Sequence, residues 1–209
     1  DYFRHLITIM TSKQVCFSEK SKETSDSILQ SLGLEANSRM IANPTLSDID
    51  VTSENRIIQE KYDLVLVHPQ SLSRSDTEKD RDMTLSLISK ERKTVIIKGN
   101  RDLHYDVLYD LWEDLSAQEN IEVFQNLEKE RFINLLKNCE RFITNSSCSF
   151  YEAPLFLEDD QIVRVGNRNR GREVVKYNVS DLKSSDTILE FLEKNLENEQ
   201  YSSSSSPPR

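Results

Sequence analysis

Two motifs late in the chain hold the residues best suited to chemistry. The first, RFITNSSCSFYE at 141–152, passes from a short apolar run through a serine pair into a helical segment with an acid, Glu152, two turns in. The second, GNRNRGR at 166–172, is an arginine-rich loop. Ser146 and Ser147 fall at a strand-to-helix junction, where the first backbone N–H groups lack partners and the helix dipole favours an anion. This corner is therefore predicted to hold a phosphate.

The elements that must position these motifs alternate between apolar runs and segments with helical periodicity. Short runs rich in β-branched residues predict five buried strands, at 64–67, 94–97, 121–124, 142–144 and 162–165. Helices are expected between the first four, at 77–91, 102–116 and 129–139. Asp102 is the expected N-cap of the second helix, whose apolar face carries Leu103, Val107, Leu108, Leu111 and Leu115. Strand–helix alternation predicts an α/β fold with a parallel sheet and right-handed crossovers.

Polar side chains follow each predicted strand. In chain order they are His68; Asn100, Arg101 and Asp102; Gln125 and Asn126; Asn145 to Ser147; and Arg168. Ligands bind beyond the carboxyl ends of the strands in such sheets, so all five groups are expected on the functional edge. Any single one is more often a loop residue without function, but five on the same edge favour a binding site.

The amino-terminal part differs in character. It is expected to hold the end of a helix at 4–12, a short strand at 15–17, a polar helix at 18–32 closed by Gly33, and a strand at 39–42. Because a domain seldom starts with an uncapped helix, we expect the chain to be the later part of a longer protein. At the other end, YSSSSSPPR at 201–209 has nothing to bury and is predicted to be disordered.

Composition excludes several classes of protein. The 209 residues carry a formal net charge of −9, which argues against a nucleic-acid partner. No stretch approaches the roughly 18 apolar residues of a membrane span, and the start DYFRHLITIM lacks the build of a signal peptide. Three cysteines at no metal-ligand spacing fit reduced thiols. We therefore expect a cytoplasmic protein that has no membrane partner and binds no tightly held metal, no NAD and no other cofactor.

Taken together, the motifs resemble the UDP-N-acetylglucosamine 2-epimerase family. The residues that carry the resemblance are HP at 68–69, GNRD at 99–102, NSSCSFYEAP at 145–154, GNRNRGRE at 166–173 and YNV at 177–179. The similarity is closest to the hydrolysing branch, which makes N-acetylmannosamine for sialic acid and related sugars, and it covers nearly all of residues 1–196. It implies the two-lobed GT-B fold, a UDP-sugar partner and a homodimer.

The resemblance also implies an organisation for this chain. Residues 1–50 would cross from a missing first lobe into the second, 51–197 would form the Rossmann-like UDP-binding lobe, and 198–209 would be the Ser/Pro tail. The carboxylates that move protons at C2 of the sugar belong mostly to the first lobe in this family. The isolated chain is therefore expected to bind UDP weakly without turning substrate over.

Roles for individual residues follow from the same resemblance. Ser146 and Ser147 would hold the diphosphate, with Arg168 adding positive charge beside it. Glu152 would accept hydrogen bonds from the ribose hydroxyls. His68 would lie close to the diphosphate as the catalytic residue of the leaving-group half of the reaction. The backbone around Gln125 and Asn126 would read the uracil edge.

Four further residues are candidates for the site: Asn100, Asp102, Arg172 and His5. Arg170 and Arg172 could each bind phosphate, but one of them is expected instead to form ion pairs with the loop or with Glu173. His5 stands at a helix start, where histidine more often packs or caps. A thiol nucleophile at Cys148 is not supported, because no histidine and acid pattern accompanies it.

Two classes of function stay open. The first is a UDP-N-acetylglucosamine 2-epimerase, hydrolysing rather than reversible, or its carboxyl-terminal portion. The second is a UDP-binding module that turns nothing over. A narrower alternative is the donor lobe of a GT-B glycosyltransferase, which would use the same lobe. The sequence upstream of Asp1 discriminates among them, because the first lobe would carry the catalytic carboxylates.

Overall fold

The computed structural model describes residues 2–11, 13–41, 43, 46, 55–175, 189, 190 and 193. These residues fall into two compact units, one made of residues 1–49 with 177–209 and one of residues 50–176, and each is described by itself. The YNV motif at 177–179 and the tail at 201–209 lie outside the described residues.

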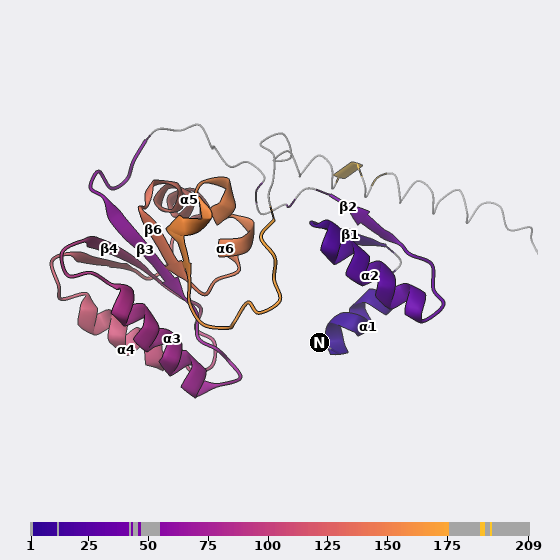
Figure 1. The fold of residues 1–209 in the computed structure, drawn as a ribbon, viewed down its shortest axis with the longest axis horizontal. Helices are drawn as coiled ribbons and strands as arrows, with labels where there is room; N and C mark the ends of the chain where they lie inside the picture. The colour runs from indigo at the N-terminus through magenta and orange to yellow at the C-terminus, as the bar shows by residue number, and fades with distance from the viewer. Residues whose placement is uncertain are drawn as a thin grey trace, which may run out of the picture. The chain divides into compact units, whose positions relative to one another are not determined.

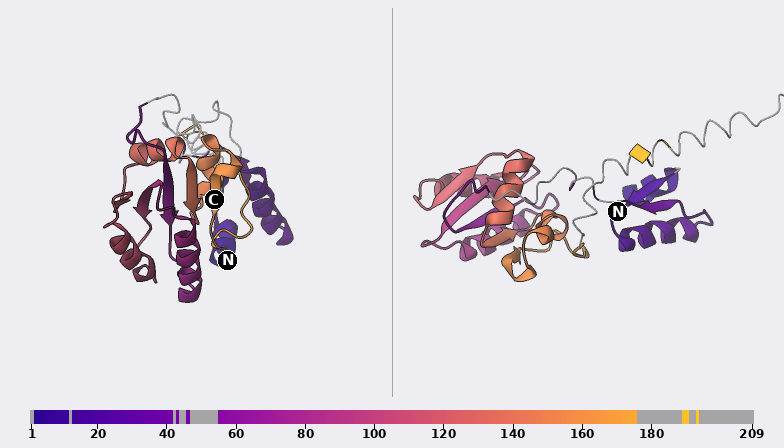
Figure 2. Two further views of the ribbon diagram at one scale, coloured as in Figure 1. Left: turned by 60° about the vertical axis from the view of Figure 1, so that its left-hand side comes forward. Right: turned by 90° about the horizontal axis from the view of Figure 1, so that it is seen from above.

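The first unit pairs two short strands with two helices (Figure 2). Its elements are α1 (Tyr2–Met10), β1 (Gln14–Cys16), α2 (Glu19–Ser31) and β2 (Ser38–Met40), and the two strands are parallel. The Ser18 side chain caps α2 by accepting the Ser21 N–H at 3.2 Å, and Gly33 follows the helix with φ +72°. The elements expected in this part of the sequence are confirmed, with bounds shifted by one or two residues.

The second unit is built on a five-stranded parallel sheet (Figure 1). The strands are β3 (Tyr62–Val67), β4 (Lys93–Lys98), β5 (Ile121–Phe124), β6 (Arg141–Thr144) and β7 (Ile162–Arg164). Their spatial order is β5-β4-β3-β6-β7, and every neighbouring pair is parallel. Every residue of β3 is buried, because this central strand is covered on both faces. All five strands expected from the sequence are confirmed.

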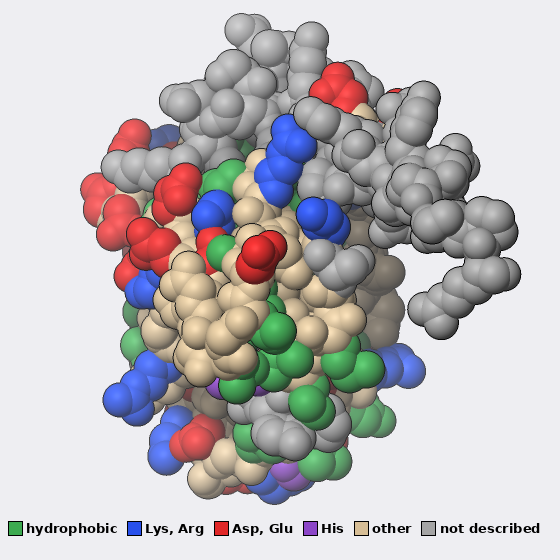
Figure 3. All heavy atoms as spheres, turned by 90° about the vertical axis from the view of Figure 1, so that its right-hand side faces the viewer, with side chains coloured by type: hydrophobic (Ala, Val, Ile, Leu, Met, Phe, Trp, Pro, Cys, Tyr) green, Lys and Arg blue, Asp and Glu red, His purple; other side chains and the backbone are tan. Residues whose placement is uncertain are grey.

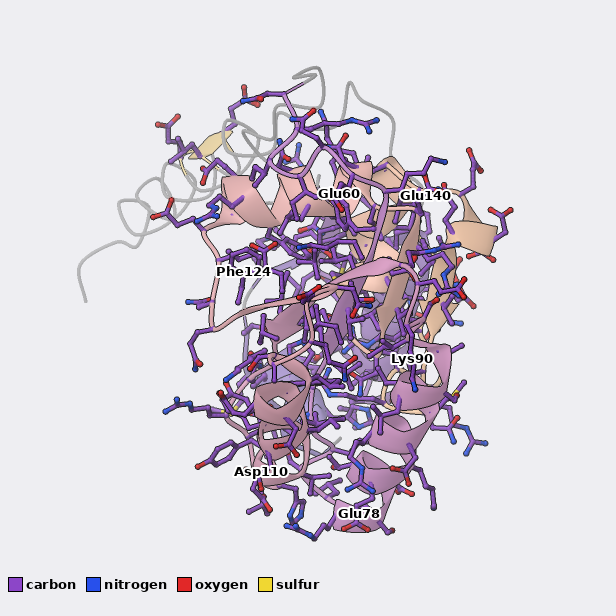
Figure 4. All side chains as sticks on the ribbon, turned by 90° about the vertical axis from the view of Figure 1, so that its left-hand side faces the viewer. Glu60, Glu78, Lys90, Asp110, Phe124 and Glu140 are labelled. Carbon is purple, nitrogen blue, oxygen red and sulfur yellow. The ribbon has the colours of Figure 1, made fainter. Side chains whose placement is uncertain are left out.

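Helices cover both faces of this sheet. They are α3 (Arg74–Leu87), α4 (Asp106–Leu115), α5 (Lys129–Asn138) and the single turn α6 (Cys148–Tyr151), followed by 3₁₀ turns at Ala153–Leu155 and Asp159–Gln161. Figure 1 shows α3 and α4 on one face and α5 and α6 on the other. Figure 4 labels Glu78 on α3 and Asp110 on α4, the two helices of the first layer. The sheet is therefore doubly wound.

The order of the strands reverses beside β3. From β3 the chain moves outward to β4 and β5, then returns through α5 to place β6 on the other side of β3. The carboxyl ends of β3 and β6 therefore flank a topological switch point, the place where ligands bind in open α/β sheets.

Two helix predictions need correction. The helix expected at 77–91 runs over Arg74–Leu87, because the Ser73 side chain caps it earlier by accepting the Asp76 N–H at 3.2 Å. The helix expected at 102–116 runs over Asp106–Leu115. Asp102 is not its N-cap, because His104 has φ +72° and breaks the helix between them.

The apolar face expected for the second of these helices also needs correction. Leu103 lies before the helix and is 65% exposed, whereas Trp112 is fully buried on the helix. The core cluster of the unit consists of Val65, Val67, Ile96, Leu108, Trp112, Ile121, Ile143 and Val165. The central strands are therefore packed tightly beneath α4.

A buried charge cluster lies at the amino-terminal ends of the strands. Asp63 is 0% exposed, and its carboxylate accepts hydrogen bonds from Arg141 Nη2 at 2.6 Å and from Arg92 Nη1 at 3.1 Å. Arg141 Nη2 also donates to the Leu87 carbonyl at 3.1 Å. The cluster joins β3, β6 and the end of α3 at the edge opposite to the predicted site.

Among the described residues, no helix has the length and apolar character needed to cross a membrane. Figure 3 shows lysine and arginine side chains interspersed with acidic, hydrophobic and other groups on the face drawn.

Candidate functional site

The Asn145 side chain joins the two strands that flank the switch point. Its Oδ1 accepts the His68 N–H at 2.7 Å, and its Nδ2 donates to the His68 carbonyl at 2.8 Å. Asn145 is 1% exposed, and its own carbonyl accepts from Asn169 Nδ2 at 2.6 Å. The amide thus continues the pairing of β3 with β6 past the last backbone pair, Leu66 with Thr144. This fixes the backbone of His68 at the carboxyl edge.

The His68 ring is held in one protonation state and one tautomer. Its Nδ1 accepts the Asn100 backbone N–H at 3.1 Å, so the ring proton must lie on Nε2. Burial, together with the positive charge of Arg168, lowers the pKa of His68 to about 4, and the negative charge of Asp102 opposes this shift. His68 is therefore neutral near pH 7 and can donate one hydrogen bond from Nε2.

Gly99 makes this geometry possible. A Cβ at this position would lie 2.4 Å from the Val67 carbonyl oxygen and 2.9 Å from His68 Nδ1. Only glycine leaves room for the turn after β4 to approach the end of β3. The GN of the 99–102 motif therefore has a structural reason, since glycine permits the approach and the next N–H binds the imidazole.

The serine pair forms a compact turn after β6. The Ser146 N–H donates to Thr144 Oγ1 at 2.9 Å, and Ser146 Oγ accepts the Cys148 N–H at 3.4 Å. Ser147 is the N-cap of α6, and its side chain makes no capping hydrogen bond. α6 has only four residues, so the attraction for an anion rests on individual N–H and O–H groups rather than on a long helix dipole.

Glu152 marks the end of the short helix that follows the serine pair. It is the C-cap of α6, one turn from Ser147, where the sequence suggested up to two turns. Its backbone N–H donates to the Cys148 carbonyl at 3.0 Å. Burial, with a contribution from the Glu152 charge, raises the pKa of Cys148 to about 12. The thiol therefore stays protonated near neutral pH, which agrees with the rejection of a thiol nucleophile.

The arginine loop at 166–172 is tied to the segment after β6. Asn169 binds the Asn145 carbonyl, and Arg172 Nη1 donates to the Tyr151 hydroxyl at 3.0 Å with its guanidinium 5.6 Å from that ring. Arg168 is exposed, and its charge reaches His68. Arg172 thus contacts a tyrosine of α6, whereas Arg168 presents its charge at the edge of the sheet.

The residues after β4 and β5 form a second group. Gln125 Nε2 donates to the Tyr109 hydroxyl at 3.5 Å, and that hydroxyl donates to the Gly99 carbonyl at 3.1 Å. Asn126 Oδ1 accepts the Leu127 N–H at 2.9 Å. Tyr109 of α4 therefore links the loops after β4 and β5.

The structure connects some predicted site residues directly. His68, Asn100, Asp102 and Arg168 are joined by a hydrogen bond or by charge. Ser146 and Ser147 follow the strand beside His68, whereas Gln125 follows β5, two strands away. His5 lies on α1 of the other unit and is exposed. Within the described ranges, no three His, Cys, Asp or Glu side chains are grouped as a metal site.

Three residues that support the site were not singled out from the sequence as members of it. Asn145 is predicted at the functional edge only as part of the Asn145–Ser147 group, without a role of its own, and nothing in the sequence singles out Tyr109. Asp80 was hidden on a helix that reads as polar throughout. Their roles depend on strand order and register, which bring together residues 77 apart such as His68 and Asn145.

The fold and this edge define a class of protein: a Rossmann-like α/β domain with a polar site at the switch point of a doubly wound parallel sheet. Residues 3–208 match the family model described as UDP-N-acetylglucosamine 2-epimerase. The chain belongs to this family.

Relatives and solved structures agree with the assignment. The chain is 24% identical over 154 residues to the GDP/UDP-N,N'-diacetylbacillosamine 2-epimerase (hydrolyzing) of Campylobacter jejuni, covering 70% of this chain and 38% of that protein. It is similar to the Methanocaldococcus jannaschii UDP-GlcNAc 2-epimerase in complex with UDP-GlcNAc and UDP, with a TM-score of 0.57 at 14% identity, over 86% of this chain and 61% of that one. For S. aureus MnaA with UDP, the TM-score is 0.56 at 18% identity, over 89% and 52%.

These similarities concern part of each relative. The chain spans 38% of the length of the Campylobacter protein and 61% and 52% of the two solved chains. The prediction of a parallel-sheet, Rossmann-like lobe of a GT-B-type fold is confirmed.

Proposed function

We propose that this chain is the UDP-binding portion of a hydrolysing UDP-N-acetylglucosamine 2-epimerase, which converts UDP-N-acetylglucosamine and water into N-acetylmannosamine and UDP. Membership of the family supports the substrate class. The hydrolysing reaction is supported by the Campylobacter relative, whose name specifies it. The observation that carries the proposal is the neutral His68 beside the serine pair at the switch point.

His68 suits the departure of a diphosphate. When the bond between C1 and the UDP oxygen breaks, negative charge develops on the diphosphate, and a fixed donor stabilises that charge more in the transition state than in the substrate. The Asn100 N–H holds the imidazole with its proton on Nε2, so the donor is oriented before substrate binds. In our proposal His68 Nε2–H, Arg168 and the Ser146–Ser147 turn share this task.

The proposed reaction has two steps. A base removes the proton from C2 while the C1–O bond breaks and UDP leaves with the electron pair, which yields a glycal. Water then adds its hydroxyl to C1 and a proton returns to C2 on the opposite face, giving N-acetylmannosamine. The balance requires no redox cofactor. We propose that the groups that move protons at C2 come from a first lobe outside this chain, so the chain alone binds UDP without turnover.

The remaining candidates receive roles at the nucleotide. Glu152 would bind the ribose hydroxyls, since a carboxylate accepts two hydrogen bonds from a vicinal diol. The backbone at Gln125 and Asn126 would bind the uracil edge, within loops that Tyr109 holds together. The other candidates of this unit are assigned a supporting role around His68 or the diphosphate: Asn100, Asp102 and Arg172.

Product analysis with the complete protein tests the proposal. Incubation with UDP-N-acetylglucosamine, followed by NMR, should give free N-acetylmannosamine and UDP. His68→Asn should lower turnover strongly, whereas His104→Asn should not, because asparagine tolerates the positive φ found at His104. UDP-N-acetylmannosamine as the product would refute the hydrolysing reaction. Bound UDP without any product would favour the non-catalytic module, and sugar transfer to an acceptor would favour a glycosyltransferase.

Calorimetric titration with UDP tests the site itself. Arg168→Ala and Glu152→Ala should each weaken binding about tenfold, the scale of one lost charge-assisted hydrogen bond. Arg56→Ala is the matched control, because this exposed arginine precedes β3, at the edge of the sheet opposite to the predicted site. Unchanged affinity in both test variants would show that the nucleotide is bound elsewhere.

The organisation of the complete protein is part of the proposal. Residues 1–50 would connect a first lobe to the UDP-binding lobe at 51–197, and 198–209 would form the tail. A homodimer in the cytoplasm is proposed by analogy with related enzymes. Analytical ultracentrifugation of the complete protein tests the dimer, and a single species of monomer mass would contradict it.

A further inference from the structure

A buried carboxylate lies beneath the predicted site. Asp80, on α3, is 3% exposed. Its Oδ2 accepts hydrogen bonds from Gln70 Nε2 at 2.9 Å and from Asn145 Nδ2 at 3.0 Å. Both of these donors are neutral amides. A buried carboxylate is costly to maintain, so its position calls for an explanation.

The loop after β7 closes over the same carboxylate. Gly166 has φ +63°, and a Cβ built there would lie 1.9 Å from Asp80 Oδ1. Only glycine allows the backbone of the 166–172 loop to pass so close to Asp80. One side chain from α3 therefore meets the loops that follow β3, β6 and β7, which are the loops that hold Gln70, Asn145 and Gly166.

Asp80 completes the hydrogen bonding of the Asn145 amide. One N–H of this amide binds the His68 carbonyl and the other binds Asp80, while Oδ1 accepts the His68 N–H. Both donors of the amide are therefore used, and a carboxylate can only accept hydrogen bonds from it. Rotation of the Asn145 amide would break all three hydrogen bonds at once.

We propose that Asp80 is a positioning residue for UDP binding: through Asn145 it fixes the His68 backbone, and thereby keeps His68 Nδ1 on the Asn100 N–H and Nε2–H directed at the diphosphate. Asp80 touches neither UDP nor the reacting atoms. The inference rests on the proposed function for its ligand. Its effect on the histidine tautomer can be observed without any ligand.

The test uses the complete protein and three variants on α3. Asp80→Ala removes the acceptor, Asp80→Asn retains an acceptor oxygen for the two amides, and Asp82→Ala removes an exposed carboxylate of the same helix as the matched control. The tautomer of His68 is read from imidazole ¹⁵N resonances, assigned with His68→Asn. UDP affinity is measured by calorimetry, and thermal denaturation reports the folded state.

The inference requires a specific pattern. Asp80→Ala should convert the single Nε2–H tautomer of His68 into a mixture and weaken UDP binding about tenfold, while Asp80→Asn and Asp82→Ala should stay within about threefold of the parent. Adding Asn145→Ala to Asp80→Ala should cause no further loss beyond that of Asn145→Ala alone, because both act through one path.

Two results would overturn it. The first is a folded Asp80→Ala variant with the parent's tautomer and UDP affinity, which would show that the carboxylate serves packing alone. The second is a loss of UDP affinity in the Asp80→Ala, Asn145→Ala double variant that equals the sum of the two single losses. If Asp80→Ala does not fold, Asp80→Val, which retains volume but cannot accept a hydrogen bond, is measured against the same criteria. Failure of the parent protein to bind UDP would instead refute the proposed function, and the ligand-free tautomer would still decide the role of Asp80.

Discussion

The depressed pKa of His68 predicts a specific loss of stability in mild acid. An unfolded histidine titrates near 6.5, whereas burial and the Arg168 charge lower the pKa of His68 to about 4 in the folded protein. Between these values the unfolded chain binds the proton and the folded chain does not, so protonation favours unfolding. The stability contribution is complete above about pH 6.5 and is lost progressively as the pH falls toward 4.

The size of the effect follows from the two pKa values. Between about pH 7.5 and about pH 5.5, linkage gives a loss of roughly 1.3 kcal/mol for His68 alone, equivalent to about a tenfold change in the unfolding equilibrium. Measurement closer to pH 5 is avoided, because the sequence pI is about 5.0 and proteins associate near zero net charge.

Urea denaturation at the two pH values measures this loss. Other groups titrate alike in the parent and in His68→Gln, so the difference between the two proteins isolates His68. The parent should lose about 1.3 kcal/mol more than His68→Gln, and His104→Asn should behave as the parent does. Equal losses in the parent and His68→Gln would mean that His68 has an ordinary pKa, and the argument for a neutral donor with a fixed tautomer would fail.

Three further predictions concern the elements around the site. Asp63→Ala should destabilise the protein by about 1.5–3 kcal/mol in urea denaturation, because it removes the buried carboxylate that binds Arg141 and Arg92; a loss below about 0.5 kcal/mol would contradict this. Gly99→Ala should weaken UDP binding at least tenfold in calorimetry, since the new Cβ would meet the Val67 carbonyl at 2.4 Å, and unchanged affinity would refute the close approach. Cys148 should react with a thiol reagent near pH 8 only after denaturation, because burial raises its pKa to about 12; rapid reaction of the native thiol would show that it is accessible.

The sequence revealed the sheet because each strand is a short apolar run that stands out from polar helices. β5 was predicted with its observed bounds at Ile121–Phe124. Helix starts were harder, because they depend on single backbone conformations. Asp102 has the chemistry of an N-cap, but the positive φ of His104 places the helix start at Asp106, and histidine adopts that conformation too rarely for the sequence to predict it.

The candidate site could likewise be predicted only in part from the sequence. His68 and the serine pair could be placed from the sequence, because residues that end parallel strands share one edge. Asp80 and Asn145 could not be paired, because their contact depends on the register of α3 against β6. A carboxylate on the polar helix α3 is normally read as solvent-exposed, and only the fold shows that this one is buried.

The switch point also has a consequence for the order of folding. β3 pairs with β4 through a single crossover that contains α3, and Asp63 lies opposite Thr94, 31 residues along the chain, whereas Asp63 pairs with Arg141 of β6, 78 residues away. Closing a longer loop costs more chain entropy and delays contact formation. We expect β3, β4 and β5 to assemble first and β6 and β7 to dock afterwards. The Asn145 amide then lies between β3 and β6, the strands whose pairing forms late. A ligand bound across these two strands would slow their separation and protect β6 from hydrogen exchange.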